Sequence, residues 1–331
     1  MIFKWSMFVC VLVLFSFMGG SVHGDITPNE LQVIYPVSID NQVERYIALF
    51  EENYPDIQVH SVKTNGTGEL VSMVKNSESG YDVLIVPDYV SLENGLMPSY
   101  ITWDIRYGNC AMVLSYTPDS AYAEMITSDN WYDILSQKNV TTAIVQPEID
   151  ARGWRSLVTM SLADDYYEKP VFSKIIPSES DITLLESESG TVLSAVSPHS
   201  YGNFLVLNTT TELIEYTKGG TVDYAWNYQG SAFQHGLSMV NLPTEIDLSS
   251  PDFQEEYWSV GVETGSGMKH SPPIVFAVSI PVNAQNRGNG IDFIRLMLSG
   301  AGKEVLQGLG QDPIQPAEGI GDIPPELRSL V

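Results

Sequence analysis

Apolar residues follow two different spacings along the first part of the chain. Short apolar runs predict strands at residues 31–35, 57–62 and 83–86. Between them, apolar residues recur every three or four positions and predict two amphipathic helices, marked first by Val43, Ile47 and Phe50 and then by Leu70, Met73 and Val74. The order strand, helix, strand, helix, strand predicts a parallel sheet with ligand chemistry at the carboxyl ends of its strands.

The same alternation resumes further along the chain. Strands are expected at residues 110–116, 142–145, 222–228, 237–242 and 274–278, the last as a return into the first unit. Helices are expected around residues 131–135 and 154–162, after Thr210, and at 290–298 and 302–308. The Ser- and Glu-rich stretch at residues 178–189 is expected to be a surface loop.

This order predicts an α/β protein of two lobes joined by two extended crossovers. Residues 25–116 and 273–331 would form lobe 1, and residues 117–272 would form lobe 2. Each lobe would be a mixed, mainly parallel sheet flanked by helices, with a ligand cleft between the lobes. An extracytoplasmic enzyme could share this architecture, so the fold alone leaves the function open.

The N-terminal segment predicts export. Lys4, an apolar run at residues 7–18 and small residues at 19–24 indicate a signal peptide over residues 1–24, although an uncleaved anchor is the alternative. Cleavage leaves Cys110 as the only cysteine, which excludes an internal disulfide. The formal net charge is −25 and no basic cluster is present, which argues against nucleic-acid binding. We expect a secreted, cell-surface-associated monomer.

Candidate chemistry lies where predicted strands are followed by helices. Four residues stand at such junctions as possible helix caps: Ser38, Thr67, Asp150 and Thr210. Unpaired N–H groups and the positive end of the helix dipole make such places suitable for an anion. A plain capping role explains each residue equally well. Thr67 is the more specific case, because Gly66 and Gly68 would let the backbone approach a ligand closely.

Asp150 narrows the class of anion. A carboxylate repels sulfate, whereas a protonated phosphate can donate a hydrogen bond to it, and a molybdate or tungstate centre can accept its oxygen. Tyr228, at the end of a predicted strand, could donate its phenol proton to an oxyanion, although a core tyrosine is the commoner case. The sequence holds no hydrolase or zinc-protease motif, so Asp150, Glu69 and His235 are only loose candidates for catalysis.

Several motifs occur in an order and spacing shared with a known family. They are Asn130-Trp131-Tyr132-Asp133-Ile134-Leu135, Gln234-His235-Gly236-Leu237, Leu242-Pro243-Thr244-Glu245-Ile246, Ile280-Pro281-Val282-Asn283-Ala284 and Ile323-Pro324-Pro325-Glu326-Leu327. Over nearly the whole mature chain, the sequence resembles archaeal molybdate/tungstate-binding proteins of ABC transporters. The resemblance implies a type II periplasmic-binding-protein fold that captures molybdate or tungstate without a cofactor and delivers it to a membrane permease.

The resemblance also implies a set of ligand residues. Hydroxyl groups would come from Ser38, Thr67, Thr210 and Tyr228, and Asp150 would add a carboxylate oxygen to the metal of the anion. Backbone N–H groups would come from the helix starts, at Val37, Ala151 and Arg152.

Two positions depart from the family pattern. Val37 stands where the family usually has glycine, and Thr210 stands where archaeal members have a glutamate. These departures leave open a phosphate-like anion or another small solute. Three glycosylation sequons begin at Asn65, Asn139 and Asn208, and we expect Asn65 and Asn208 to be unmodified if the neighbouring threonines bind a ligand.

Overall fold

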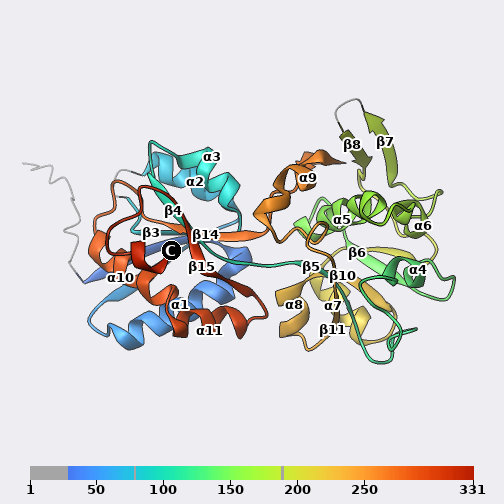
Figure 1. The fold of residues 1–331 in the computed structure, drawn as a ribbon, viewed down its shortest axis with the longest axis horizontal. Helices are drawn as coiled ribbons and strands as arrows, with labels where there is room; N and C mark the ends of the chain where they lie inside the picture. Colours follow the sequence, from blue (N-terminus) through green and yellow to red (C-terminus); the bar gives the residue numbers. More distant parts are fainter. Residues whose placement is uncertain (1–28, 78–79, 188–189) are drawn as a thin grey trace, which may run out of the picture.

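A computed structural model describes residues 29–77, 80–187 and 190–331 of the protein. Figure 1 shows two α/β bodies that lie side by side and are joined by extended segments. The expected signal peptide at residues 1–24 lies outside the described residues. None of the helices in the described part is both long and apolar enough to cross a membrane.

The first body is built on a six-stranded sheet with the order β15-β4-β14-β3-β1-β2. Its strands are β1 (Glu30–Pro36), β2 (Gln58–Thr64), β3 (Val83–Val86), β4 (Trp103–Asn109), β14 (Val275–Ser279) and β15 (Asp312–Gly321). Its helices are η1 (Val37–Ile39), α1 (Asp40–Asn53), α2 (Thr67–Asn76), α3 (Tyr89–Leu96), α10 (Arg287–Met297), α11 (Gly300–Gln307) and η3 (Arg328–Leu330). Because β1 pairs in parallel with β2 and β3, the predicted parallel unit is confirmed.

The second body is built on a five-stranded sheet with the order β11-β5-β10-β6-β9. Its strands are β5 (Met112–Tyr116), β6 (Thr142–Val145), β9 (Phe204–Leu207), β10 (Tyr224–Tyr228) and β11 (Ser238–Asn241). Its helices are α4 (Trp131–Leu135), α5 (Ala151–Tyr167), α6 (Val171–Ile175), α7 (Thr210–Lys218), α8 (Gln229–Gln234), η2 (Pro251–Phe253) and α9 (Gln254–Ser259). β6 is parallel to β9 and β10, so the carboxyl ends of these three strands lie at one edge.

A third, four-stranded sheet adjoins the second body. It has the order β13-β12-β8-β7, with β7 (Thr183–Ser187), β8 (Gly190–Ser194), β12 (Val260–Thr264) and β13 (Gly267–His270). The expectation of a surface loop at residues 178–189 was therefore wrong for residues 183–187. Their polar composition suggested a loop, but antiparallel pairing with β8 satisfies their backbone groups as a strand.

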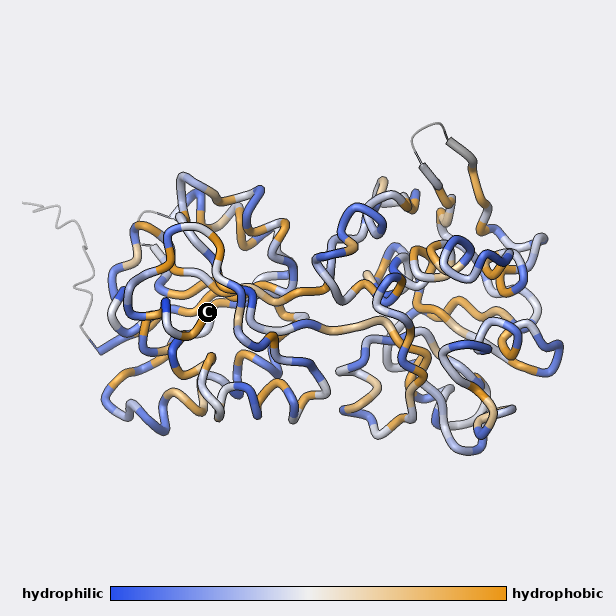
Figure 2. The backbone as a smooth tube through the Cα atoms, viewed as in Figure 1, coloured by the Kyte–Doolittle hydropathy of each residue, from blue (hydrophilic) through white to orange (hydrophobic). Residues whose placement is uncertain are grey.

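The predicted apolar faces form the core. Val43 and Phe50 of α1 are 0% exposed, and all four residues of β3 are buried. Figure 2 shows hydrophobic segments concentrated along the strands inside both bodies, with hydrophilic segments mostly outside. Most charged residues of the helices lie between the apolar positions, on the faces that point away from the core. Much of the negative charge therefore lies at the surface.

Two segments carry the chain between the bodies. The first joins β4 to β5, and because β5 pairs with β10 and β11, the chain has already entered the second sheet before residue 116, where the sequence expectation ended lobe 1. The return segment precedes β14, and the N–H of Cys110 donates to the carbonyl of Ile274 between the two segments at 3.0 Å. Burial raises the pKa of the Cys110 thiol to about 11, so it is unreactive at neutral pH.

Candidate functional site

Asp150 caps α5, as the sequence predicted. Its Oδ1 accepts a hydrogen bond from the N–H of Arg152 at 2.9 Å. Its Oδ2 accepts from the Thr210 hydroxyl at 2.9 Å and lies 3.2 Å from Nε of Arg152. Since a carboxylate can accept about four hydrogen bonds, these contacts leave roughly one direction free for a ligand.

Thr210 does not cap α7, contrary to the expectation. Thr209 is the cap: its hydroxyl accepts from the N–H of Glu212 at 3.1 Å, and the Glu212 carboxylate accepts from the N–H of Thr209 at 3.3 Å. This capping box requires threonine three positions before glutamate, which selects Thr209 from the run of threonines. The Thr210 hydroxyl is thereby available to Asp150, which is 60 residues away in the sequence.

Tyr228 ends β10 beside two arginines. Nη1 of Arg155 donates to the Tyr228 hydroxyl oxygen at 2.8 Å, and the Arg152 guanidinium lies 5.0 Å from the centre of the Tyr228 ring. Burial raises the pKa of Tyr228, although the charges of both arginines act in the opposite direction. Because the phenol oxygen accepts from Arg155, its own proton remains available to an anion.

Arg152 connects these residues to the core. It is 8% exposed, and its Nη1 donates to Oδ1 of the buried Asn227 at 2.8 Å. Its backbone N–H, which the resemblance assigned to the ligand, donates to Asp150 in this structure. Within the described ranges, the N–H of Ala151 donates to no protein group, which leaves it free to face a ligand. We call Asp150, Arg152, Arg155, Thr210 and Tyr228 the second-body cluster.

Gly153 allows α5 to start directly against β6. A Cβ atom at this position would lie 2.1 Å from the Val145 carbonyl oxygen and 3.0 Å from Cα of Pro147. No side chain fits there, so glycine is required by the close approach of the helix start to the strand end. This approach places Asp150 at the carboxyl edge of the second sheet.

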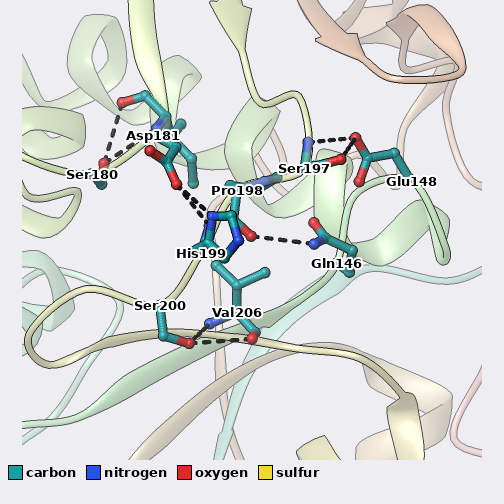
Figure 3. A network of polar contacts seen from close by, with 10 residues as sticks. Gln146, Glu148, Ser180, Asp181, Ser197, Pro198, His199, Ser200 and Val206 are labelled. Carbon is teal, nitrogen blue, oxygen red and sulfur yellow. Dashed lines mark hydrogen bonds and ion pairs between the residues drawn. The ribbon is translucent and has the colours of Figure 1, made fainter.

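Segments next to the third sheet also hold the loop that carries Asp150. Oε1 of Glu148 accepts hydrogen bonds from the N–H groups of Ser197 at 2.5 Å and Gly265 at 3.0 Å. Figure 3 shows Glu148 turned toward Ser197 and Gln146 turned toward Pro198, whose carbonyl accepts from the Gln146 amide at 3.2 Å. The segment after β8 and the turn between β12 and β13 therefore fix the loop that precedes α5.

Ser38 and Val37 lie just beyond β1 in the short helix η1. Both are exposed, Val37 by 50%. Ser38 does not cap α1, as had been expected; Ile39 occupies the cap position without a side-chain hydrogen bond. The additional turn of η1 moves the start of α1 by two residues, and the Ser38 hydroxyl keeps no protein partner within the described ranges.

Thr67 is the first residue of α2, and Gly66 occupies the cap position. A Cβ atom at Gly66 or Gly68 would meet nothing within 4 Å, so the helix start is open on that side. The Glu69 carboxylate accepts from the backbone N–H of Asn65 at 2.7 Å and from its side-chain amide at 2.9 Å. Glu69 therefore stabilises the turn before the helix, and its carboxylate is already occupied by local donors.

The two groups of candidate residues belong to different bodies that touch near them. The Asn41 amide, in the first turn of α1, donates to the Gln234 side chain at the end of α8 at 2.8 Å. α1 begins two residues after Ser38, and α8 begins directly after Tyr228. Within the described ranges, no hydrogen bond or ion pair joins Ser38 or Thr67 to the second-body cluster, so the structure assembles only the second half of the predicted set.

Sequence reasoning missed Arg155 and Asn227, which hold Tyr228 and Arg152. One signal was present for Arg155: it follows Arg152 by three residues in a predicted helix, and such residues share a helix face. Nothing in the sequence pattern marks Asn227. In the described part of the chain, no group of three or more His, Cys, Asp or Glu side chains could hold a metal ion. Asp150 is thus a single carboxylate.

Comparisons with known proteins agree with this architecture. A family model described as bacterial extracellular solute-binding protein matches residues 31–310. An uncharacterized solute-binding protein of Methanoculleus marisnigri is 32% identical over 339 residues, covering 98% of this chain and 95% of that protein. The molybdate/tungstate-binding protein WtpA of Pyrococcus abyssi is 28% identical over 343 residues, covering 98% of this chain and 96% of that protein.

Solved structures share the fold. The substrate binding domain of a putative molybdenum ABC transporter from Clostridium difficile aligns with a TM-score of 0.57 and 12% identity, over 86% of this chain and 99% of that one. Iron-bound HitA from Pseudomonas aeruginosa aligns with a TM-score of 0.53 and 13% identity, over 89% of each chain.

Two α/β bodies with polar groups at the carboxyl ends of their parallel strands have the type II periplasmic-binding-protein fold. The chain belongs to the bacterial extracellular solute-binding protein family. The family is one of solute-binding proteins, and those of ABC transporters deliver their solute to a membrane permease.

Proposed function

We propose that this protein captures molybdate or tungstate between its two bodies and delivers the anion to the permease of an ABC importer. One observation carries the proposal: the second-body cluster brings hydroxyl, guanidinium and carboxylate groups together at the carboxyl ends of β6, β9 and β10. The Tyr228 hydroxyl and the two guanidinium groups are donors that suit a tetrahedral oxyanion, and the similar WtpA is named as a molybdate/tungstate-binding protein.

The charges of the cluster support an anion. Arg152 lies beside Asp150 and offsets its negative charge, and Arg155 adds a positive charge next to Tyr228. The cluster therefore attracts an anion although the whole chain carries a formal charge of −25. Ser38 and Thr67 would add hydroxyl donors from the first body when the bodies close.

Asp150 would give the site its preference for a metal-centred anion. Sulfate has no proton to donate to the remaining lone pair of Asp150, and its charge is repelled. Molybdenum or tungsten can accept that lone pair, because the metal centre can expand its coordination beyond four oxygens. Thr210 and Arg152 hold the carboxylate in place for this contact.

Calorimetric titration with tungstate, molybdate, sulfate and phosphate tests the proposal on protein freed of endogenous ligand. Tyr228→Phe should weaken tungstate binding roughly tenfold or more, since a hydrogen bond to a charged group is lost. Tyr216→Phe is the matched control, because Tyr216 is 39% exposed on α7 and its hydroxyl forms no hydrogen bond with any described residue. Absence of heat with both tungstate and molybdate would refute the proposed ligand.

A phosphate-like anion is the second candidate. It is favoured by Thr210, which supplies a hydroxyl rather than the second carboxylate of archaeal molybdate/tungstate-binding proteins. A protonated phosphate would donate to Asp150, so its affinity should fall as rising pH removes that proton. Titrations with phosphate at several pH values separate this candidate from tungstate, which needs no proton to contact Asp150.

A further inference from the structure

A cavity of about 320 Å³ lies between the two bodies, next to the second-body cluster. α3 of the first body contributes Asp88 at its start and Asn94, while α5 contributes Trp154 and Arg155. Trp258, at the end of α9, and His270, in β13, also line the cavity. The volume falls within the range of small-molecule sites, which is about 300–1,000 Å³.

The distribution of tryptophans singles out this cavity. In the described part of the chain, Trp103, Trp131 and Trp226 are at most 1% exposed. The other two, Trp154 and Trp258, both line the cavity, and Trp258 is 47% exposed. Trp154 packs partly against the core, whereas Trp258 is exposed. Two incompletely buried indoles gathered at one cavity favour a binding role, because their apolar surface gains from being covered.

The aromatic walls are held in defined orientations. The rings of Trp258 and His270 stack with centroids 5.1 Å apart and an angle of 17° between their planes. Nδ1 of His270 donates to the Trp258 carbonyl at 2.8 Å, which fixes the imidazole against the indole. Elsewhere in the lining, the Arg155 guanidinium lies 5.0 Å from the Trp154 ring centre. Flat surfaces therefore exist before any ligand arrives.

The charges of the cavity favour an anion. Nη1 of Arg155 donates to Tyr228, and among the described residues no group accepts a hydrogen bond from its Nη2, so the guanidinium retains donor capacity. Among the described residues, no carboxylate forms an ion pair with Arg155. The Asp88 carboxylate is occupied as the cap of α3: it accepts from the N–H of Ser91 at 3.2 Å and from the Ser91 hydroxyl.

We propose that this cavity is a second compartment of the anion site, which receives the aromatic ring of an aryl-bearing oxyanion while Arg155 and Tyr228 hold its charged group. The inference rests on the proposed function, since it places the anionic group of the ligand at the second-body cluster. A bare oxyanion contacts the cluster but leaves the exposed part of Trp258 uncovered. An aryl phosphate contacts both, and because the walls come from both bodies, its ring also favours their closed arrangement.

Phenyl phosphate, inorganic phosphate and tungstate are the probes. Calorimetry and intrinsic tryptophan fluorescence are recorded on the full exported chain and on Trp258→Leu, whose exposed position spares the core. Tyr166→Leu, on the distal part of α5 and 42% exposed, is the matched control. We expect phenyl phosphate to bind about tenfold or more tighter than phosphate and to change the fluorescence. Trp258→Leu should lower the ratio of phenyl phosphate affinity to phosphate affinity about tenfold and leave tungstate binding unchanged.

Two outcomes overturn the inference and remain distinguishable. If tungstate or phosphate binds but phenyl phosphate binds no tighter than phosphate, or Trp258→Leu leaves their ratio unchanged, the second compartment is refuted and the oxyanion function stands. If none of the three anions binds to protein whose melting curve shows it to be folded, the proposed function itself fails.

Discussion

Asp104 in β4 is the site of the prediction that tests the electrostatics most directly. The residue is 0% exposed, and within the described ranges neither of its carboxyl oxygens has a hydrogen-bond partner. The nearby Arg106 is occupied by other acids, at 2.8 Å from Glu93 and 3.1 Å from Glu318. Asp104→Asn keeps the shape of the side chain and removes its ability to ionise.

The size of the expected change in stability follows from the pKa of Asp104. Burial raises the pKa of Asp104 from 3.8 to about 7, helped by the charge of Glu93 and opposed by that of Arg106. A pKa raised on folding adds stability below the unfolded value, and that stability is lost as pH rises through the folded value. Complete ionisation of Asp104 lowers the free energy of unfolding by about 4 kcal/mol, and about 3 kcal/mol of this loss falls between pH 5 and pH 8.

Asp104→Asn should therefore change stability differently at the two pH values. The costs of the new amide are the same at both, so they cancel in the difference, and the variant should gain about 3 kcal/mol relative to wild type on going from pH 5 to pH 8. For a protein of this size, this is a relative rise in melting temperature of about 5 °C. Thermal melting at both pH values measures it.

Asp82→Asn is the matched control. Asp82 is 2% exposed, but it accepts from the N–H groups of Gln32 at 2.9 Å and Asn286 at 2.6 Å. Replacing an acceptor oxygen by an amide donor against these N–H groups should destabilise the protein at both pH values. Equal loss of stability for Asp104→Asn at pH 5 and pH 8 would show that Asp104 does not change its ionisation in this range and would refute the reasoning.

Three further predictions concern the binding site. Gly153→Ala should lower stability by about 1–3 kcal/mol or more and weaken tungstate binding, because the new Cβ would lie 2.1 Å from the Val145 carbonyl oxygen. Melting curves should show no such loss for the control Gly288→Ala, whose Cβ would meet nothing within 4 Å. Thr210→Glu supplies a second carboxylate oxygen to the metal and should raise tungstate affinity relative to sulfate, and unchanged calorimetric selectivity would contradict metal coordination. Peptide mass spectrometry should find Asn65 unmodified, and a fully occupied glycan there would count against a ligand at the start of α2.

Much of the fold follows from short-range patterns. The apolar run of β3 and the spacing of Val43, Ile47 and Phe50 in α1 were predicted because such patterns need only a few neighbouring residues. Asp150 was predicted as a cap for the same reason. Ser38 and Thr210 were misplaced within their turns, because a short 3₁₀ turn and a run of threonines shift a helix start by one or two residues.

The remaining features depend on contacts between distant segments. β7 is a strand because β8 pairs with it, and its own composition indicates a loop. Likewise, the membership of β5 in the second sheet depends on its pairing with β10 and β11. Strand pairing satisfies backbone groups with partners that local sequence does not specify.

By itself, the sequence determined the alternation of strands and helices, the acidic composition and the start of α5 at Asp150, since propensity, periodicity and capping act over a few residues. Only the tertiary structure decided that Thr210 donates to Asp150, that Arg155 holds Tyr228, and that Trp154 and Trp258 face one cavity. The partners in these contacts lie 60, 73 and about 100 residues apart, and folding alone brings them within reach.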